Sequence, residues 1–279
     1  MDMSRIVTAA AINVVAERIA FGNMHGAVQL KNFRTQDILP PSVFHQGPVR
    51  AIRFSTDGRM IAFGGDDMAV NAIEISTGTG RQYRDAKGVI NSVDISDTGM
   101  IVAGCGDHNT YVFRIASQRD VERLHHPLGV NHVSLTPRGH LLACAGPGGV
   151  MLWDTNDWKQ FPTLEDTPIK LVRFSKDGRR LAVVTMTNAV KIMDTTHAFD
   201  VIALPIVGKR EEVGDVGDIA FDYTGTRVGI CRNDGVLTVW DYKLDTVMQP
   251  DFGTTAIKVW TVDFQPDGQF VPLFLRPTF

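Results

Sequence analysis

The stretch Val49–Glu74, with the sequence VRAIRFSTDGRMIAFGGDDMAVNAIE, decides the fold. It contains two short apolar runs, VRAIRF and RMIAFGG, on either side of the turn STDG, and a third apolar run follows Asp66 and Asp67. Brief apolar runs that include β-branched residues are typical of strands. Asp57-Gly58 supplies the left-handed conformation that a tight turn between antiparallel strands requires. The stretch therefore predicts consecutive antiparallel strands joined by tight turns.

The same pattern recurs along almost the whole chain. Its turn glycines are spaced by 41, 40, 39, 47 and 43 residues, and they are Gly58, Gly99, Gly139, Gly178, Gly225 and Gly268. A strand-like run precedes each glycine, as VRAIRF, INSVDI, VNHVSL, IKLVRF, VGDIAF and VWTVDF. One more copy fits at the start, where RIAFGN aligns with RMIAFG. A repeat of about 40 residues is typical of β-propeller blades, and no stretch shows a sustained helical period with caps. We therefore expect an all-β fold with little helix.

These repeats resemble those of the WD-repeat family, whose third strand often ends in Trp-Asp. Trp153-Asp154 in GGVMLWD and Trp240-Asp241 in NDGVLTVWD match this motif. Four other repeats carry a different residue at the Trp position, namely Lys31, Ile73, Phe113 and Met193. The last three fall with Trp153 at intervals of 40 residues. The resemblance covers almost the whole chain and implies a ring of four-stranded blades.

The family's buried network of His, Asp and Trp is incomplete in every repeat. His45 and Asp67 fall in one repeat, but Ile73 occupies its Trp position. His126 also falls at the His position, and the Gly that usually precedes the His is absent in both cases, as Phe44 and His125. The repeats are therefore degenerate members of the pattern.

The ring is expected to be unfinished. The inferred blades cover approximately residues 5–45, 46–85, 86–125, 126–165, 166–211 and 212–252, with a partial blade over 253–279. Two strand-like runs in the last blade give about 26 strands, where seven full blades need 28. Three explanations are open: the natural chain continues past Phe279, the last blade is a two-stranded stub, or a partner pairs with the free edge. Pro272 and Pro277 suit an edge, because proline cannot donate to a ladder. We expect one propeller domain of about seven blades, the last incomplete.

Composition limits the class of partner and the compartment. With 28 Lys and Arg against 31 Asp and Glu, the chain shows no electrostatic footprint for nucleic acid. Its three cysteines are far apart and lie in apolar runs, which indicates core thiols and a reducing compartment rather than disulfides or zinc. Asp2 cancels Arg5 and no cleavage site follows, so no signal peptide is expected. No apolar run approaches the roughly 20 residues of a membrane helix. We expect an intracellular, cytoplasmic protein without a membrane span.

No catalytic motif emerges from the sequence. Gly78 and Gly80 in STGTGR lack the strand-to-helix setting of a nucleotide loop. The four histidines between residues 125 and 140 span a loop, a strand and a turn, whereas metal ligands must converge. Carboxylates lie mostly in turns, so no acid–base pair stands out. Neither a catalytic residue, a metal site nor a cofactor is predicted.

Partner contacts are a better prediction. In WD-repeat proteins partners often touch the face near the channel, at the start of each first strand and just before the turn Asp. Alignment of the repeats carries these positions over to Thr8, Arg50, Asn91, Asn131, Lys170, Gly217 and Trp260, and to Met24, Asp66, Gly106, Gly146, Met186 and Asn233. The candidate partner-binding residues are Arg50, Asp66, Asn91, Asn131, Lys170, Asn233 and Trp260. Trp and Arg are common in binding hot spots, although such residues also line solvated rims.

The expected function is a scaffold or adaptor that presents a rigid surface to protein partners, as a subunit of a larger assembly. A related alternative is a propeller that acts inside one fixed complex. An alternative of another class is an enzyme with its active site in the central channel. Catalysis there would need His, Asp, Glu or Arg at channel-facing positions, and we expect those positions to be mainly apolar or small. The sequence therefore favours binding over catalysis.

Overall fold

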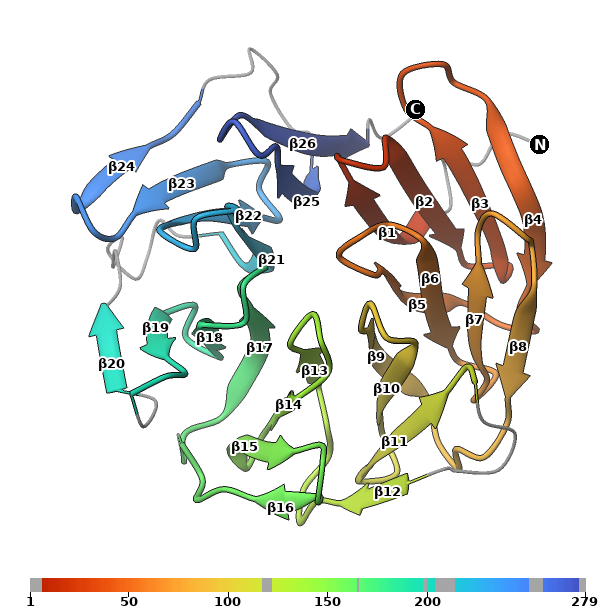
Figure 1. The fold of residues 1–279 in the computed structure, drawn as a ribbon, viewed down its shortest axis with the longest axis horizontal. Helices are drawn as coiled ribbons and strands as arrows, with labels where there is room; N and C mark the ends of the chain where they lie inside the picture. Colours follow the sequence, from red (N-terminus) through yellow and green to blue (C-terminus); the bar gives the residue numbers. More distant parts are fainter. Residues whose placement is uncertain are drawn as a thin grey trace.

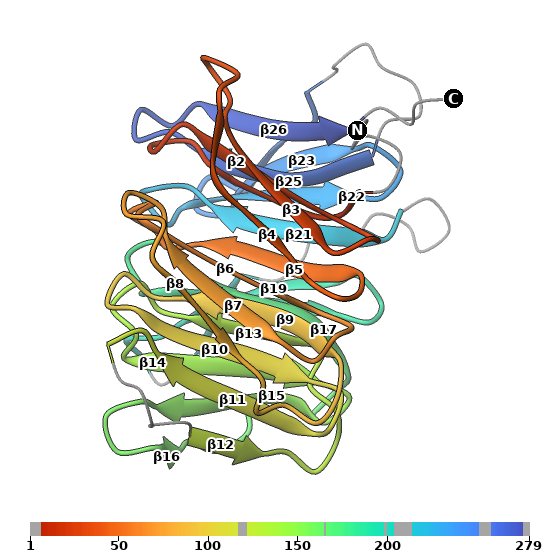
Figure 2. The same cartoon turned by 90° about the vertical axis from the view of Figure 1, so that its right-hand side faces the viewer.

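The computed structural model describes residues 7–116, 122–164, 166–197, 200–203, 214–250 and 258–275. Over these residues the chain forms 26 strands and no α-helix. The strands make seven antiparallel sheets arranged as blades around a central axis (Figure 1). Figure 2 shows the same ring from its side. The prediction of an all-β propeller with an incomplete last blade is confirmed.

Each of the first six blades contains four strands in chain order, from the innermost to the outermost. The first three blades consist of β1 (Val7–Asn13), β2 (Arg18–Asn23), β3 (Ala27–Asn32) and β4 (Ile38–Phe44); β5 (Val49–Phe54), β6 (Met60–Gly65), β7 (Val70–Glu74) and β8 (Gly80–Tyr83); β9 (Ile90–Ile95), β10 (Met100–Cys105), β11 (Asn109–Arg114) and β12 (Glu122–His125). The next three consist of β13 (His132–Leu135), β14 (Leu141–Gly146), β15 (Gly149–Asp154) and β16 (Lys159–Gln160); β17 (Ile169–Phe174), β18 (Arg180–Thr185), β19 (Val190–Asp194) and β20 (Asp200–Ala203); β21 (Val216–Phe221), β22 (Arg227–Arg232), β23 (Leu237–Asp241) and β24 (Thr246–Met248).

The turn between the first and second strand sets the repeat. All six glycines that define the repeat in the sequence adopt positive φ, between 62° and 86°. At Gly58 a Cβ atom would also lie 2.4 Å from Ala16 of the preceding blade. Glycine therefore serves both the tight turn and the close approach of neighbouring blades.

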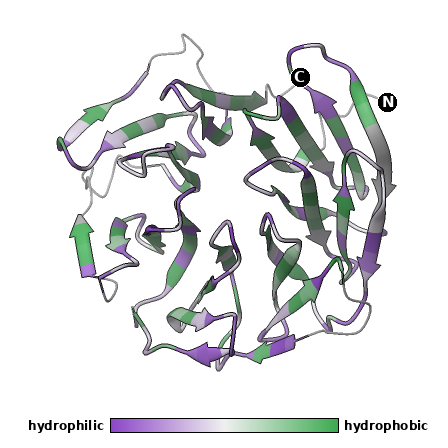
Figure 3. Ribbon diagram, in the orientation of Figure 1, coloured by the Kyte–Doolittle hydropathy of each residue, from purple (hydrophilic) through white to green (hydrophobic). Residues whose placement is uncertain are grey.

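Apolar residues recur along the strands of the blades (Figure 3), and buried apolar side chains form clusters between neighbouring blades. One cluster joins Ala62 and Val70 of the second blade to Ile90 and Ile101 of the third, and similar clusters join other neighbouring blades. The three cysteines are buried and free, as expected for core thiols. Burial raises the pKa of Cys144 to about 12, which keeps this thiol protonated and unreactive at neutral pH.

The seventh blade contains only β25 (Lys258–Phe264) and β26 (Phe270–Leu275) among the described residues. Residues 270–274 are all half-buried, whereas the equivalent strands β6, β10, β14 and β18 are almost entirely buried. Within the described part of the chain, β26 therefore lacks the cover that a third strand gives to its counterparts. Pro272 lies on this strand, and Pro277 falls outside the described residues.

A pair of contacts to one carboxylate ties this blade into the ring. Val14, directly after β1, donates its backbone N–H to Asp263 Oδ2 at 2.9 Å. Lys176 of the fifth blade places Nζ 2.5 Å from Oδ1 of the same residue. Asp94 and Ser134 likewise accept backbone N–H groups of the next blade, at 2.8 and 3.1 Å. A hydrogen bond from a backbone N–H to a side-chain oxygen therefore joins the first and last blades, as it does other neighbouring blades.

Candidate binding sites in the central channel

The innermost strands of the blades line a channel with a cavity at each end. We name the face on which these strands begin the strand-start face, and the opposite face, where the first two strands of each blade are joined, the hairpin face. The cavity on the strand-start face has a volume of about 240 Å³ and is lined by β1, β5, β9, β13, β21 and β25. The cavity on the hairpin face, of about 130 Å³, is lined by the innermost strands of all seven blades.

A β-bulge sets the direction of the side chains on the strand-start face. In six innermost strands the register shifts at the second residue of the repeated motif, at Thr8, Arg50, Asn91, Lys170, Gly217 and Trp260. A bulge bends the strand and redirects a side chain out of the regular alternation. These six bulge positions belong to the first set of positions found by alignment of the repeats. The alignment therefore predicted where the side chains on this face lie.

Two of the candidate residues act between blades. Asn91 Nδ2 donates to the Val130 carbonyl at 2.9 Å, and Asn131 Nδ2 donates to the Ile169 carbonyl at 3.1 Å. Thr8 Oγ1 makes the corresponding bond to the Val49 carbonyl at 2.5 Å. In each case the carbonyl precedes the equivalent position of the next blade. These side chains therefore link the innermost strands of neighbouring blades by hydrogen bonds.

The charged candidates form ion pairs on the rim. Arg50 pairs with Asp66, and Lys170 pairs with Asp215. Asn233 Nδ2 donates to the other oxygen of Asp215 at 3.3 Å. The Arg50 side chain remains half exposed. Exposed pairs of this kind contribute little to stability, so their side chains can exchange partners at small cost.

Trp260 lies at the edge of the strand-start cavity. Its ring is half-buried and lines the cavity with Arg50 and Asn91. Lys258, two residues before it, places Nζ 3.8 Å from the ring centroid. Phe264 rather than Trp260 belongs to the apolar cluster between the sixth and seventh blades. Three of the seven candidate residues thus line one cavity, while Asp66, Asn131, Lys170 and Asn233 lie outside its lining.

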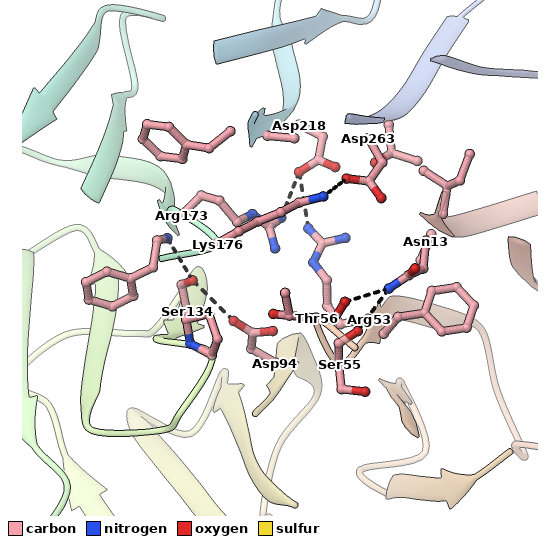
Figure 4. Close-up of a pocket in the computed structure, with 18 of the residues that line it drawn as sticks. Asn13, Arg53, Ser55, Thr56, Asp94, Ser134, Arg173, Lys176, Asp218 and Asp263 are labelled. Atoms are coloured by element: carbon pink, nitrogen blue, oxygen red, sulfur yellow. Dashed lines mark hydrogen bonds and ion pairs between the residues drawn. The ribbon is translucent and has the colours of Figure 1, made fainter. Parts of the chain in front are cut away.

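The channel is crossed at mid-depth by a charged cluster that the sequence interpretation missed. Arg53 of the second blade and Arg173 of the fifth both donate to Asp218 Oδ1 of the sixth, at 3.2 and 2.8 Å (Figure 4). The three side chains are 19%, 15% and 8% exposed. Burial alone would raise the pKa of Asp218, but the two guanidinium groups outweigh burial and lower its pKa to about 2. The carboxylate therefore stays ionised and bridges opposite sides of the ring.

Polar side chains continue toward the hairpin face. Asp94 accepts the Ser134 hydroxyl at 3.2 Å, and Asn13 Nδ2 donates to the Ser55 and Thr56 carbonyls at 3.1 Å (Figure 4). The expectation that channel-facing positions are mainly apolar or small was wrong. The reason is the alternation of the inner strands, which turns the fifth residue of the repeated motif toward the channel. That residue is polar in five of the six motif copies, as Arg53, Asp94, Ser134, Arg173 and Asp263.

His132 occupies the channel wall between the two cavities. Its Nδ1 atom is buried without a hydrogen-bond partner in the described structure. Burial, reinforced by Arg173 and Arg53, holds the pKa of this imidazole well below its usual value. His132 is therefore neutral at physiological pH and adds no charge to the channel.

A second histidine supports the strand-start face from within a blade. His45 Nδ1 lies 2.6 Å from Asp67 Oδ1, and Asn71 Nδ2 donates to His45 Nε2 at 2.9 Å. Asn71 thus supplies a polar partner in a repeat whose Trp position is Ile73. The network fixes the loop that carries Asp66, the partner of Arg50.

A metal-binding group and a membrane-spanning helix are both absent from the described residues. Within the described residues, no three His, Cys, Asp or Glu side chains gather as a metal-binding group. None of the described segments forms a helix long and apolar enough to span a membrane.

Comparison with known proteins shows what two of these repeats are similar to. The family model described as WD domain, G-beta repeat matches residues 41–71 and 119–154. The first match contains His45 and Asp67, and the second ends at Trp153-Asp154. The chain is also 25% identical over 149 residues to the WD repeat-containing protein SL1-17 of Schistosoma mansoni, which covers 52% of this chain. The match spans about half of that relative, 47% of its length.

The matched repeats and the ring of blades agree on one architecture. The third, fifth and sixth blades, which fall largely outside the two matches, have the same four strands, the same turn glycine and the same bulged inner strand as the second blade. Repeats whose sequence motifs are degenerate therefore still form regular four-stranded blades. The chain is a β-propeller whose repeats are similar to WD repeats.

Proposed function

We propose that this propeller is a protein-binding scaffold whose principal contact surface is the strand-start face, and that it works as a subunit of a larger assembly. WD-repeat propellers typically act as protein-interaction scaffolds. The observation that carries the proposal is the row of bulges at the second motif position, which directs Arg50 and Trp260 toward one cavity. A rigid ring that displays an aromatic and an Arg beside a cavity has the composition of a hot spot.

Exposed apolar residues on the same face support this proposal. Met24, Met68, Leu128 and Met186 are 44–57% exposed and lie in the loops of the strand-start face. Methionine is flexible and polarisable, and it is frequent on surfaces that adapt to a partner. Arg53, Arg173 and Asp218 of the channel cluster, in contrast, pair with one another, and Lys176 pairs with Asp263. The channel chemistry therefore supports binding and ring stability more than catalysis.

Among the described residues β26 pairs only with β25, so its other edge is a second surface that a partner strand could use. Its apolar residues are half-buried, and an unpaired strand edge is a template for another chain. Pro272 removes one donor from this strand, which disfavours pairing along its full length. We rank this edge below the strand-start face for that reason.

The three unpaired core thiols support a reducing, intracellular location.

Single substitutions on the strand-start face test the proposal. Trp260→Ala, Arg50→Ala and Lys170→Ala should each leave the melting temperature nearly unchanged, because none of these side chains belongs to an apolar cluster between blades. Trp260→Ala should weaken partner binding by about 2 kcal/mol, roughly 30-fold. The measurement is the dissociation constant of a partner that co-purifies in fixed stoichiometry, with Lys243→Ala on the hairpin face as the matched control. Unchanged affinity in all three variants would refute the proposal and direct attention to the edge of β26.

A further inference from the structure

The strand-start cavity carries a surplus of positive charge, although the chain as a whole has a net charge of −3. Its lining contains Arg50, Arg53 and Lys258 but only one carboxylate, Asp218. Cationic linings attract anions most strongly where the walls exclude water. The cavity is therefore a candidate site for a negatively charged group.

Most of these cations already have partners. Asp66 offsets Arg50, and Asp218 is shared between Arg53 and Arg173. Asp94 also acts on Arg53 from the hairpin side of the cluster. After these pairings, the positive charge without a carboxylate in contact is that of Lys258.

Lys258 is held at the cavity without an ion-pair partner among the described residues. Its ammonium group rests on the Trp260 ring at 3.8 Å. Burial lowers the pKa of Lys258, an effect that Asp215 opposes and Lys170 reinforces at longer range. No described residue accepts a hydrogen bond from this half-buried ammonium group, which has N–H donors beyond the side that rests on the π face.

The remaining lining leaves room for an acceptor. Gly217 occupies the bulge position of the sixth blade, where the other blades carry a side chain. The cavity of about 240 Å³ lies between this glycine, Trp260 and Lys258. One uncompensated positive charge matches a single negative charge better than a doubly charged group.

We infer that the cavity receives one carboxylate side chain of a partner protein, which pairs with Lys258 while its methylene groups pack on Trp260. This inference rests on the proposed function, because it takes the strand-start face as the partner-binding surface. A charge-assisted hydrogen bond in a partly enclosed site distinguishes a carboxylate from the corresponding amide. The partner segment is therefore acidic at the residue that enters the channel.

Two short peptides and inorganic phosphate serve as probes. Acetyl-Gly-Glu-Gly-amide should bind the protein at least about 10-fold more tightly than acetyl-Gly-Gln-Gly-amide, because only Glu supplies the negative charge. The measurement is the shift of the Trp260 indole signal in an NMR titration at constant ionic strength, with Trp260→Phe to assign the signal. Lys258→Gln should weaken Glu-peptide binding by about 10-fold, and Lys258→Arg should restore most of it. Lys243→Gln is the control and should have no effect.

The inference would be overturned by equal binding of the two peptides, by Glu-peptide binding that survives Lys258→Gln, or by phosphate binding that depends on Lys258 and exceeds binding of the Glu peptide. The last result would assign the site to a phosphate group instead. Absence of Glu-peptide binding together with loss of partner affinity in Trp260→Ala would overturn this inference and leave the proposed function standing. Full partner affinity in Trp260→Ala, Arg50→Ala and Lys170→Ala would refute the proposed function separately.

Discussion

Replacement of Trp240 by alanine is expected to lower the free energy of unfolding by about 3–5 kcal/mol. Trp240 is 2% exposed and belongs to the apolar cluster that joins the fifth and sixth blades. Its ring packs edge-on against Tyr242, with centroids 5.9 Å apart. Blades are rigid sheets, so their neighbours cannot collapse fully into the space that a large indole leaves. Urea unfolding of the variant and the parent measures the difference.

Two comparison variants sharpen this prediction. Trp240→Phe should cost less than Trp240→Ala, because phenylalanine keeps most of the aromatic volume and leaves a smaller cavity. Both variants remove an indole N–H that is buried without a hydrogen-bond partner in the described structure. Trp153→Ala should cost only about 1–2 kcal/mol, because Trp153 is half-buried and loses less apolar area. Equal stability of the parent and Trp240→Ala would show that the sixth blade is packed differently.

Replacement of Asp218 by alanine is expected to destabilise the ring by about 3–5 kcal/mol, the range for removing one partner of a buried ion pair. Arg53 and Arg173 would then face each other across the channel without a counter-ion. All three side chains are less than one-fifth exposed, so solvent screens their repulsion poorly. Arg59→Ala, which removes an exposed pair with Asp57, is the matched control and should change stability little.

The acid dependence of stability gives an independent measure of the same carboxylate. The pKa of Asp218 is about 2 in the folded chain, below its ordinary value of 3.8. A lowered folded pKa stabilises the protein above the unfolded value and loses that effect as the pH falls. The Asp218 contribution should therefore be complete above about pH 4 and decline toward pH 2. Asp218→Asn should lack this component, so the stability difference between parent and variant should shrink between pH 4 and pH 2. A constant difference over that range would contradict the ion-pair account.

Sequence periodicity was sufficient to predict the fold, because each blade repeats the same local signals. The turn glycines, the apolar inner strands and the Trp-Asp pairs act within about 40 residues of one another. Alignment of the repeats also found the bulged positions, such as Arg50 and Trp260, without any knowledge of the bulges. Trp153 and Trp240 occupy the same position in the aligned repeats, but in the structure only Trp240 is fully buried.

The channel cluster could not be predicted from local pattern in the same way. Arg53 and Asp218 are 165 residues apart, and their contact depends on the diameter of the closed ring. The same holds for Asp263 and Val14, which meet only because the last blade returns to the first. The available signal was a charged residue at the fifth position of the motif, in Arg53, Asp94, Arg173 and Asp263, whereas Asp218 is at the third position. That signal marks residues that face the channel but does not specify which ones pair.

The central claim is that partners dock on the strand-start face, and site-specific photo-crosslinking tests it most directly. A photoreactive amino acid placed at Met24 or Met186 on that face, and at Val15 or Leu244 on the hairpin face, leaves the fold intact because all four side chains are 51–73% exposed. We expect a crosslinked partner from Met24 and Met186, with yields several-fold above those from Val15 and Leu244. Crosslinks obtained from Val15 and Leu244 but not from Met24 and Met186 would contradict the claim.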